Sequence, residues 1–234
     1  MISVCIATYN GDRFIQRQLE TILTQIASKD EVVVSDDSST DTTLGIISGF
    51  KDERIRVLSG QTFRSPTYNF ENALKHARGE IIVLADQDDE WMPNRISSAL
   101  EALERKSLVV CDAEVIDSDG SVILASLRQL YRPSTGLIAN LFRNRYTGCC
   151  MAFRREVLDV ALPFPAKLPW HDWWIGLVCE AFFSSSFIDQ KLIRYRRHDS
   201  NISDTGRSST SAWTTRIAQR WNIGVALAAR GLVH

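Results

Sequence analysis

The sequence lacks an excess of charge of either sign, because 27 basic residues stand against 28 acidic ones in 234 residues. A general nucleic-acid binder is usually basic, so we expect no nucleic-acid partner. No apolar run approaches the roughly 18 residues that a membrane-spanning helix needs, and no basic leader precedes the first apolar run. These absences predict a cytoplasmic protein and leave open a peripheral contact with the inner face of the cell membrane.

Cysteine is scarce, and its five positions show no recognisable pattern. Their number is odd and their spacing is neither CxxC nor CxH, which argues against a disulfide framework and against a structural zinc site. Several of the cysteines lie inside apolar runs, as small core residues do. We therefore expect reduced, buried thiols.

Glycine-rich phosphate loops are also missing from the sequence. It contains no GxGxxG after the first apolar run and no GxxxxGK[ST] anywhere. A nucleotide bound to this chain would need another way to neutralise its diphosphate. A divalent cation such as Mg²⁺ or Mn²⁺, held by carboxylates, would provide one.

The first half of the chain alternates buried apolar runs with amphipathic helical patterns. Strands are predicted at residues 2–10, 30–37, 54–59, 80–86 and 107–116, and helices at 12–27, 41–50, 67–78 and 93–106. Continuous apolar strands in strict alternation with helices predict an α/β fold, a Rossmann-like doubly wound sheet that is mostly parallel.

The second half is less regular. We expect a hairpin turn at 117–120, strands at 149–155 and 190–198, helices at 135–145, 171–183 and 212–234, and a mobile loop at 199–211. The last helix carries tryptophans and arginines. It fits a membrane-surface helix, a homodimer contact, or a cover for the core, and the sequence leaves all three open.

Polar side chains follow the predicted parallel strands, at the sheet edge where such folds bind ligands. Three clusters lie there, namely Thr8, Tyr9, Asn10 and Asp12, then Asp36 and Asp37, then Asp86, Gln87, Asp88 and Asp89. Clustered carboxylates repel when empty and become favourable around a cation. The alternative is that Asp89 caps the helix that follows and the others are solvated.

Two further segments carry reactive or ligand-binding side chains. In "LPWHDWWIG" an acid, Asp172, either caps a helix or has its pKa raised by the surrounding tryptophans. In "IRYRRHDS" the basic run is either a phosphate site or a solvated edge strand. Gly148 suggests a close backbone approach to a ligand.

The segments "SVCIATYNG", "VVVSDDSSTDTT" and "IIVLADQDDEW", in this order, resemble the signature of family 2 inverting glycosyltransferases with the GT-A fold. The DQDD form followed by Trp91 is similar to bacterial enzymes that build O-antigen or capsule glycans, rhamnosyltransferases among them. The resemblance implies one GT-A catalytic domain at 1–203, divided into a nucleotide-sugar half (1–115) and an acceptor half (116–203). Residues 204–234 would form a mobile loop and a C-terminal helix.

The resemblance also implies roles for individual residues. Asp172 is expected to be the catalytic base, and Mn²⁺ or Mg²⁺ is expected to bind Asp88, Asp89 and His198. The donor nucleotide is expected to contact Thr8, Tyr9, Asn10, Asp12, Asp36, Asp37, Asp86 and Gln87. The acceptor or sugar is expected at Gly148, Trp170, His171 and Trp173, and the diphosphate at Arg196 and Arg197.

The implied reaction is metal-dependent transfer of a sugar, with inversion, from a UDP- or dTDP-linked donor to a hydroxyl of a saccharide or lipid-linked acceptor. The implied setting is bacterial cell-surface polysaccharide synthesis. Two alternatives remain open: a sugar nucleotidyltransferase and a non-catalytic glycan-binding module. A nucleotidyltransferase would need a glycine-rich, basic loop where the chain has "TYNGDRF". A glycan-binding module would not explain the DQDD group.

Overall fold

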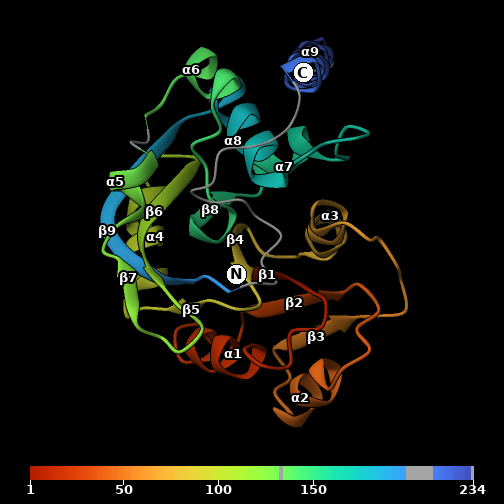
Figure 1. The fold of residues 1–234 in the computed structure, drawn as a ribbon, viewed down its shortest axis with the longest axis vertical. Helices are drawn as coiled ribbons and strands as arrows, with labels where there is room; N and C mark the ends of the chain where they lie inside the picture. Colours follow the sequence, from red (N-terminus) through yellow and green to blue (C-terminus); the bar gives the residue numbers. More distant parts are fainter. Residues whose placement is uncertain (132–133, 199–212, 233–234) are drawn as a thin grey trace.

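The computed structural model describes residues 1–131, 134–198 and 213–232, and its strands pair into one curled sheet (Figure 1). The strand order is β3-β2-β1-β4-β8-β6-β9-β5, with β7 paired to β6. The strands are β1 (Ile2–Thr8), β2 (Glu31–Asp36), β3 (Ile55–Leu58), β4 (Ile81–Asp86), β5 (Glu90–Trp91), β6 (Leu108–Ile116), β7 (Val122–Leu124), β8 (Met151–Arg154) and β9 (Ser185–Arg196).

Helices connect these strands and cover the sheet. They are α1 (Ile15–Leu23), α2 (Thr43–Gly49), α3 (Pro66–His76), α4 (Arg95–Leu103), α5 (Leu127–Tyr131), α6 (Leu137–Phe142), α7 (Glu156–Ala161), α8 (His171–Phe182) and α9 (Trp213–Gly231), with a 3₁₀ turn, η1, at Gly148–Cys150. The predicted α/β fold is confirmed.

The first four strands lie next to one another and are all parallel. β1 pairs in parallel with both β2 and β4, and β2 pairs in parallel with β3. β1 and β2 are almost completely buried, and so is the middle of β4. Their continuous apolar sequences follow from this burial, because helices cover both faces of such a strand.

The remainder of the sheet departs from the simple alternation. β8 runs antiparallel between β4 and β6, while β9 lies parallel to β6. The strand expected at 149–155 was wrong at its start, because residues 148–150 form η1 and the strand begins at Met151. The strand expected at 190–198 begins earlier, at Ser185. No strand was predicted at β5, and no helix was predicted at α5 or α7.

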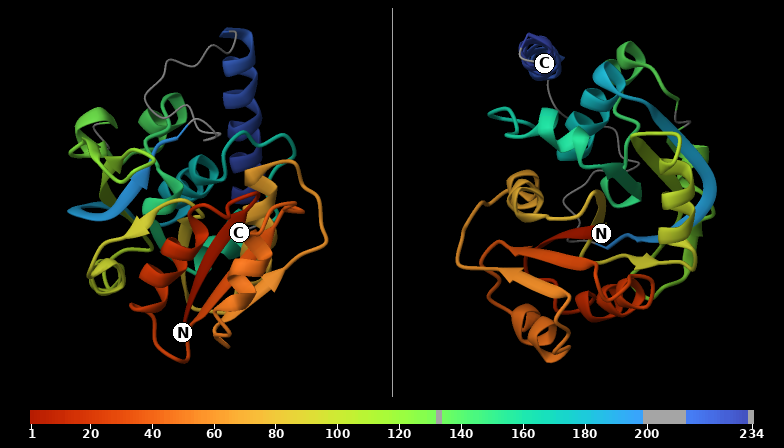
Figure 2. Two further views of the ribbon diagram at one scale, coloured as in Figure 1. Left: turned by 60° about the horizontal axis from the view of Figure 1, so that its bottom comes forward. Right: turned by 180° about the vertical axis from the view of Figure 1, so that it is seen from behind.

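The C-terminal helix α9 lies beside α6 and α8, at the end of the molecule away from β2, β3 and α2 (Figure 1 and Figure 2). Ile223 and Leu227 of α9 are buried, so one side of the helix covers the α6–α8 region. The loop predicted to be mobile at 199–211 lies outside the described residues. Within the described part of the chain, no helix is both long and apolar enough to cross a membrane.

Candidate functional site

The site lies where β1, β2 and β4 end. The register pairs Thr8 with Asp36 across β1 and β2, and Ala7 with Asp86 across β1 and β4, so the polar residues that follow these strands meet at one edge. η1 and the first turn of α8 complete this edge, because Asp172 at the start of α8 is close enough to Asp86 to raise its pKa. Segments far apart in the sequence thus converge on one place.

Thr8 and Asp36 lie below the surface of the site. Both are buried, with exposed fractions of 1% and 0%. The Thr8 hydroxyl donates to Asp36 Oδ1 at 3.1 Å, and the Ser39 amide and hydroxyl donate to the same carboxylate at 2.9 and 2.5 Å. Through these hydrogen bonds, Thr8 and Asp36 stabilise the loop after β2.

Tyr9 is the exposed aromatic of the site, with 53% of its surface accessible. The Gln87 side chain bridges its backbone: the Tyr9 amide donates to Gln87 Oε1 at 3.0 Å, and Gln87 Nε2 donates to the Tyr9 carbonyl at 3.1 Å. A Cβ on Gly11 would lie 2.3 Å from Gln87 Oε1. A glycine at position 11 therefore makes room for the amide that joins the β1 and β4 loops.

Asn10 and Asp12 join the loop after β1 to the loop after β2. The Thr40 amide donates to Asn10 Oδ1 at 2.8 Å, and the Thr42 hydroxyl donates to Asp12 Oδ2 at 3.0 Å. Asn10 takes a left-handed backbone conformation with φ of 46°. Asparagine adopts this region more readily than most residues. These contacts hold the two loops together beside Tyr9.

Asp37 follows Asp36 and lies next to the segment before α3. Its amide donates to the Thr8 carbonyl at 2.9 Å, and its Oδ1 accepts a short hydrogen bond from the Phe63 amide. Asp37 is 8% exposed. Its carboxylate is thus oriented by one backbone donor at the edge of the site.

The carboxylates after β4 lie in a crowded, low-dielectric place. Burial raises the pKa of Asp86 to about 7, helped by the negative charges of Asp88 and Asp172. Burial and the same kind of repulsion raise the pKa of Asp89 well above its usual range. Ligand atoms of Asp86, Asp89 and Cys149 lie within 4.8 Å of one another, and Asp89 Oδ2 is buried without a hydrogen-bond partner in the part of the chain that the structure describes.

These observations fit a divalent cation. Carboxylates that repel one another and hold protons near neutral pH become ionised and favourable around a 2+ charge. Asp88 and His198, two of the three residues expected to bind metal, are in contact, because His198 Nε2 lies 2.8 Å from Asp88 Oδ2. The third, Asp89, accepts from the Arg196 amide at Oδ1, at 2.9 Å, and still keeps a ligand atom in the group with Asp86 and Cys149.

Arg196 is buried rather than held out toward solvent, with 6% of its surface exposed. Its guanidinium donates to the carbonyls of Asp88, Asp117 and Ser118 at 2.9 to 3.2 Å and forms a short ion pair with Glu90. These acceptors fix the carboxylate loop against β9 and the turn after β6. Arg197 donates its amide to the Ile116 carbonyl and has a half-buried side chain.

Asp172 lies in the first turn of α8, two residues after the capping position. Its Oδ1 accepts from the Trp173 amide at 2.6 Å and from Asn144 Nδ2 at 3.3 Å. Burial raises the pKa of Asp172 to about 6, although the Trp173, Asn144 and Gly148 donors oppose the shift. A carboxylate with this pKa is ionised at neutral pH and is a stronger base than an ordinary aspartate.

The residues around Asp172 are closely packed. His171 is 8% exposed and stacks on Phe70 at 4.1 Å between ring centroids, and burial lowers its pKa to about 3. Both of its ring nitrogens lack a hydrogen-bond partner among the described residues. A Cβ on Gly148 would lie 2.9 Å from His171 Nε2, so glycine is required for this close packing. Trp173 is buried, whereas Trp170 is 37% exposed.

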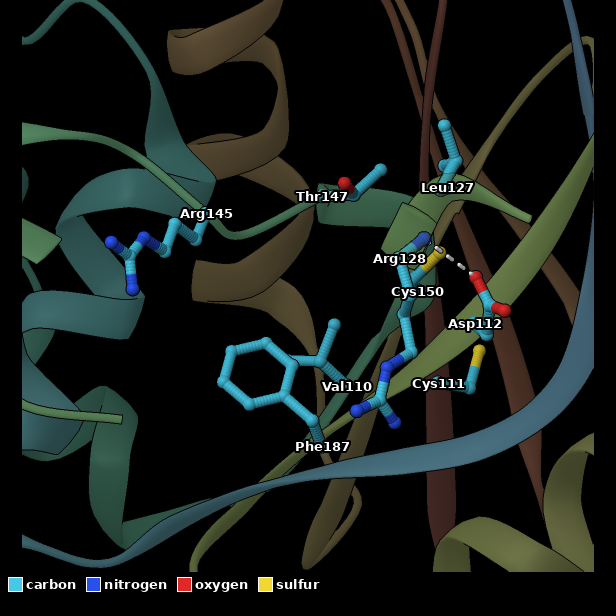
Figure 3. Close-up of a pocket in the computed structure, with 9 residues that line it drawn as sticks. All are labelled: Val110, Cys111, Asp112, Leu127, Arg128, Arg145, Thr147, Cys150 and Phe187. Atoms are coloured by element: carbon cyan, nitrogen blue, oxygen red, sulfur yellow. Dashed lines mark hydrogen bonds between the residues drawn. The ribbon is translucent and has the colours of Figure 1, made fainter. Parts of the chain in front are cut away.

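A small cavity lies behind the site, between β6, α5 and η1 (Figure 3). Its volume of about 20 Å³ accommodates roughly one water molecule and no nucleotide. The Arg128 amide donates to Asp112 Oδ1 at 3.1 Å at its wall. The residues that line it are Val110, Cys111, Asp112, Leu127, Arg128, Arg145, Thr147, Cys150 and Phe187.

Three residues that the structure places in the site were not predicted from the sequence. Asn144 donates to Asp172 from the loop after α6, Cys149 lies among the carboxylates, and the Phe63 amide orients Asp37. Cys149 resembles an ordinary core residue in its apolar surroundings. Asn144 and Phe63 stand in irregular segments that no periodic pattern marks.

Comparison with known proteins gives a consistent result. Residues 3–161 match the family described as Glycosyl transferase family 2. The chain is 25% identical to the UDP-Glc:alpha-D-GlcNAc-diphosphoundecaprenol beta-1,3-glucosyltransferase WfgD of Escherichia coli, over 87% of this chain and 79% of that protein. It is 28% identical to the dTDP-rhamnosyl transferase RfbG of Shigella flexneri, over 83% of this chain and 72% of that protein.

Two solved structures share the fold. S. aureus TarS 1-349 in complex with UDP-GlcNAc superposes with a TM-score of 0.74 at 18% identity, over 98% of this chain and 66% of that one. The mannosyltransferase PcManGT from Pyrobaculum calidifontis, in complex with GDP-Man and Mn²⁺, superposes with a TM-score of 0.64 at 23% identity, over the whole of this chain and 64% of that one. The chain thus spans about two thirds of the length of these two structures.

Proposed function

Because the chain belongs to glycosyl transferase family 2, we propose that it transfers a sugar, with inversion and with the help of a divalent metal, from a nucleoside-diphosphate donor to a hydroxyl of a saccharide or lipid-linked acceptor. The observation that carries the proposal is the proximity of Asp172, whose pKa is raised to about 6, to Asp86 at the end of β4. A candidate base, Asp172, and the carboxylates after β4, which suit a cation, thus lie in the same site.

The donor nucleotide is proposed to bind beside Tyr9, whose exposed ring offers a stacking face for the base. Asp37, oriented by the Phe63 amide, is proposed to accept from the N–H of the base. The buried Thr8 and Asp36 support this site from below. Gln87 is proposed to act by positioning Tyr9.

The cation is proposed to be Mn²⁺ or Mg²⁺, held by Asp88 and His198 with Asp86 or Asp89 beside them. When bound, it would supply positive charge that stabilises the leaving nucleoside diphosphate. Arg197 is proposed to contact the diphosphate oxygens. The buried contacts of Arg196 support a different role for that residue, which is to fix the loop that carries Asp88.

Asp172 is proposed to accept the proton of the acceptor hydroxyl as that oxygen attacks the anomeric carbon. A single displacement from the opposite face inverts the configuration, as in single-displacement glycosidases. Asn144, the Trp173 amide and the Gly148 amide orient the carboxylate. Trp170, which is partly exposed, and His171 are proposed to line the acceptor or donor sugar.

The relatives support the choice of substrates. The name of the E. coli relative includes UDP-Glc and a diphosphoundecaprenol acceptor, and that of the Shigella relative includes a dTDP-rhamnosyl group. We therefore propose a UDP- or dTDP-linked donor and a lipid-linked acceptor, in bacterial surface polysaccharide synthesis at the cytoplasmic face of the membrane. The assignment to a glycosyltransferase family stands against the nucleotidyltransferase and glycan-binding alternatives.

A calorimetric titration with UDP, dTDP and GDP, each with and without Mn²⁺, tests this proposal. We expect one nucleotide to bind in a metal-dependent manner, and Asp88→Ala to abolish the metal dependence. Asp159→Ala, which removes an exposed carboxylate on α7 far from β4 in sequence, is the matched control. Absence of binding by every nucleotide, both with and without Mn²⁺, would reject the donor site.

A further inference from the structure

The outer sides of α6 and α9 expose apolar side chains that no described element covers. On α6, Ile138 and Phe142 are one helical turn apart and are 74% and 64% exposed. On α9, Ile217, Trp221 and Val225 recur every fourth residue and are 53%, 72% and 53% exposed. The apolar side of α9 that faces the protein is a different one, formed by Ile223 and Leu227.

The two exposed stripes belong to one surface. Nη2 of Arg220 on α9 donates to the Phe142 carbonyl at the end of α6, at 2.6 Å. Both helices lie on the same end of the molecule (Figure 1). We call the outer sides of α6 and α9, with these five apolar residues, the α6–α9 surface.

The segments that form this surface have a distinct charge. α6, residues 143–145 after it, and α9 together contain five arginines and no acidic residue, so the rest of the chain holds 22 basic against 28 acidic residues. Arg143 is exposed at the end of α6 and Arg220 is half-buried on α9. Glu180 of α8, which reaches this region, is bonded to the Tyr146 hydroxyl and to the Gly136 amide.

An apolar stripe with a Trp, flanked by arginines and free of acids, is the pattern of a helix that lies in a membrane interface. Arginine next to such a stripe also favours anionic lipids, because the cytoplasmic leaflet carries negative charge. A water-facing surface would have little reason to expose a Trp at 72% between an Ile and a Val at helical spacing.

The α6–α9 surface is also connected to the catalytic side of the site. Asn144, which donates to Asp172, follows α6 by two residues. Trp173 Nε1 donates to the Asn140 carbonyl in α6 at 2.7 Å, and the Arg220 guanidinium lies 5.9 Å from the Trp173 ring. An acceptor anchored in a membrane below α6 and α9 would therefore stand close to Asp172.

We infer that the α6–α9 surface docks on the surface of an anionic lipid bilayer, with its apolar residues at the headgroup boundary and the exposed Arg143 on a lipid phosphate. The inference that this docking presents a lipid-linked acceptor to Asp172 rests on the proposed function. The docking itself does not depend on it.

Vesicle flotation with the full chain tests the docking. The protein is expected to float with vesicles of phosphatidylcholine and phosphatidylglycerol, and not with phosphatidylcholine alone, and added salt is expected to weaken the binding. Trp221→Glu and Phe142→Glu are each expected to lower the partition coefficient by about ten-fold or more. Val57→Glu on β3, at the other end of the molecule, changes a partly exposed apolar residue in the same way and is expected to bind like the parent chain.

Flotation of both surface variants like the parent chain, or no flotation of the parent chain, would overturn the docking. A dimer seen by light scattering without lipid, lost in Trp221→Glu and with no flotation, would instead identify this surface as a contact between two copies. Calorimetry of the same variants with UDP and dTDP separates the two proposals. No flotation of the parent chain, with retained nucleotide binding, rejects only the docking. Flotation of the parent chain that the surface variants lose, without nucleotide binding by the parent chain, rejects only the proposed donor site.

Discussion

Replacing Asp172 with Asn should lower activity and raise stability at the same time. The amide cannot accept the proton of an acceptor hydroxyl, so we expect kcat to fall by about 10²- to 10⁴-fold. The side chain keeps its size, and its oxygen can still accept from the Trp173 amide. Nucleotide binding should therefore remain close to that of the parent chain.

The stability gain follows from the pKa. Burial raises the pKa of Asp172 from 3.8 to about 6, and a shift of this size corresponds to about 3 kcal/mol at about 1.4 kcal/mol per unit. The folded-state value is the higher one, so the cost to the folded state is full above pH 6, declines as the pH falls, and is absent below 3.8. Losing one acceptor for the Gly148 or Asn144 donor costs about 1 kcal/mol, which leaves a net gain of about 2 kcal/mol at pH 8.

Thermal unfolding at pH 8 and at pH 4, in buffer with a chelator, measures this gain. For a chain of this size about 2 kcal/mol raises Tm by roughly 4 to 8 °C. At pH 4 the ionisation cost is nearly absent, so Asp172→Asn should lose its advantage there and be less stable than the parent by up to about 1 kcal/mol, the cost of the lost acceptor. Asp159→Asn, an exposed position on α7, should leave Tm unchanged at both pH values. A variant that is less stable than the parent at pH 8, or one that keeps full activity, would refute the reasoning.

Three further changes test how the site is supported. Gly176→Ala should destabilise the protein by about 1 to 3 kcal/mol, measured by urea unfolding, because the new Cβ would lie 2.3 Å from the Tyr146 ring. Gly11→Ala should weaken nucleotide binding in calorimetry, because its Cβ would displace the Gln87 amide that holds the β1 loop; an unchanged Kd would contradict this. Arg196→Met should cost about 3 to 5 kcal/mol of unfolding free energy and reduce metal binding, since its guanidinium fixes the carboxylate loop; a variant with parental Tm and metal affinity would count against that role.

The parallel half of the fold could be predicted because burial on both faces leaves a direct trace in the sequence. Val32, Val33 and Val34 are all completely buried, as their continuous apolar run indicates. The antiparallel insertion of β8 could not be predicted, because an apolar run reports burial and not the strand beside it. Residues 149–150 read as strand for the same reason, although they form a 3₁₀ turn.

The candidate site was predicted in outline and less well in its internal contacts. Asp88 and His198 were expected together and lie 2.8 Å apart. A run of arginines in the sequence does not show whether a given arginine contacts a phosphate or forms buried contacts within the protein. Arg196 is buried and forms an ion pair with Glu90. Such a distinction depends on acceptors contributed by distant segments. The further roles of the site residues stay predictions.

The contacts by which Arg196 holds the loop that carries Asp88 affect the order in which the protein can fold during its synthesis. The first four parallel strands are encoded within residues 2–86, so they can pair as soon as that stretch leaves the ribosome. The loop that carries Asp88 is held by residues 107 to 110 positions later, at the end of β9. Contacts of such large sequence separation form late in folding. A nascent chain would therefore pair its first four strands before its carboxylate loop is set, which implies that the proposed cation site is among the last parts of the protein to form.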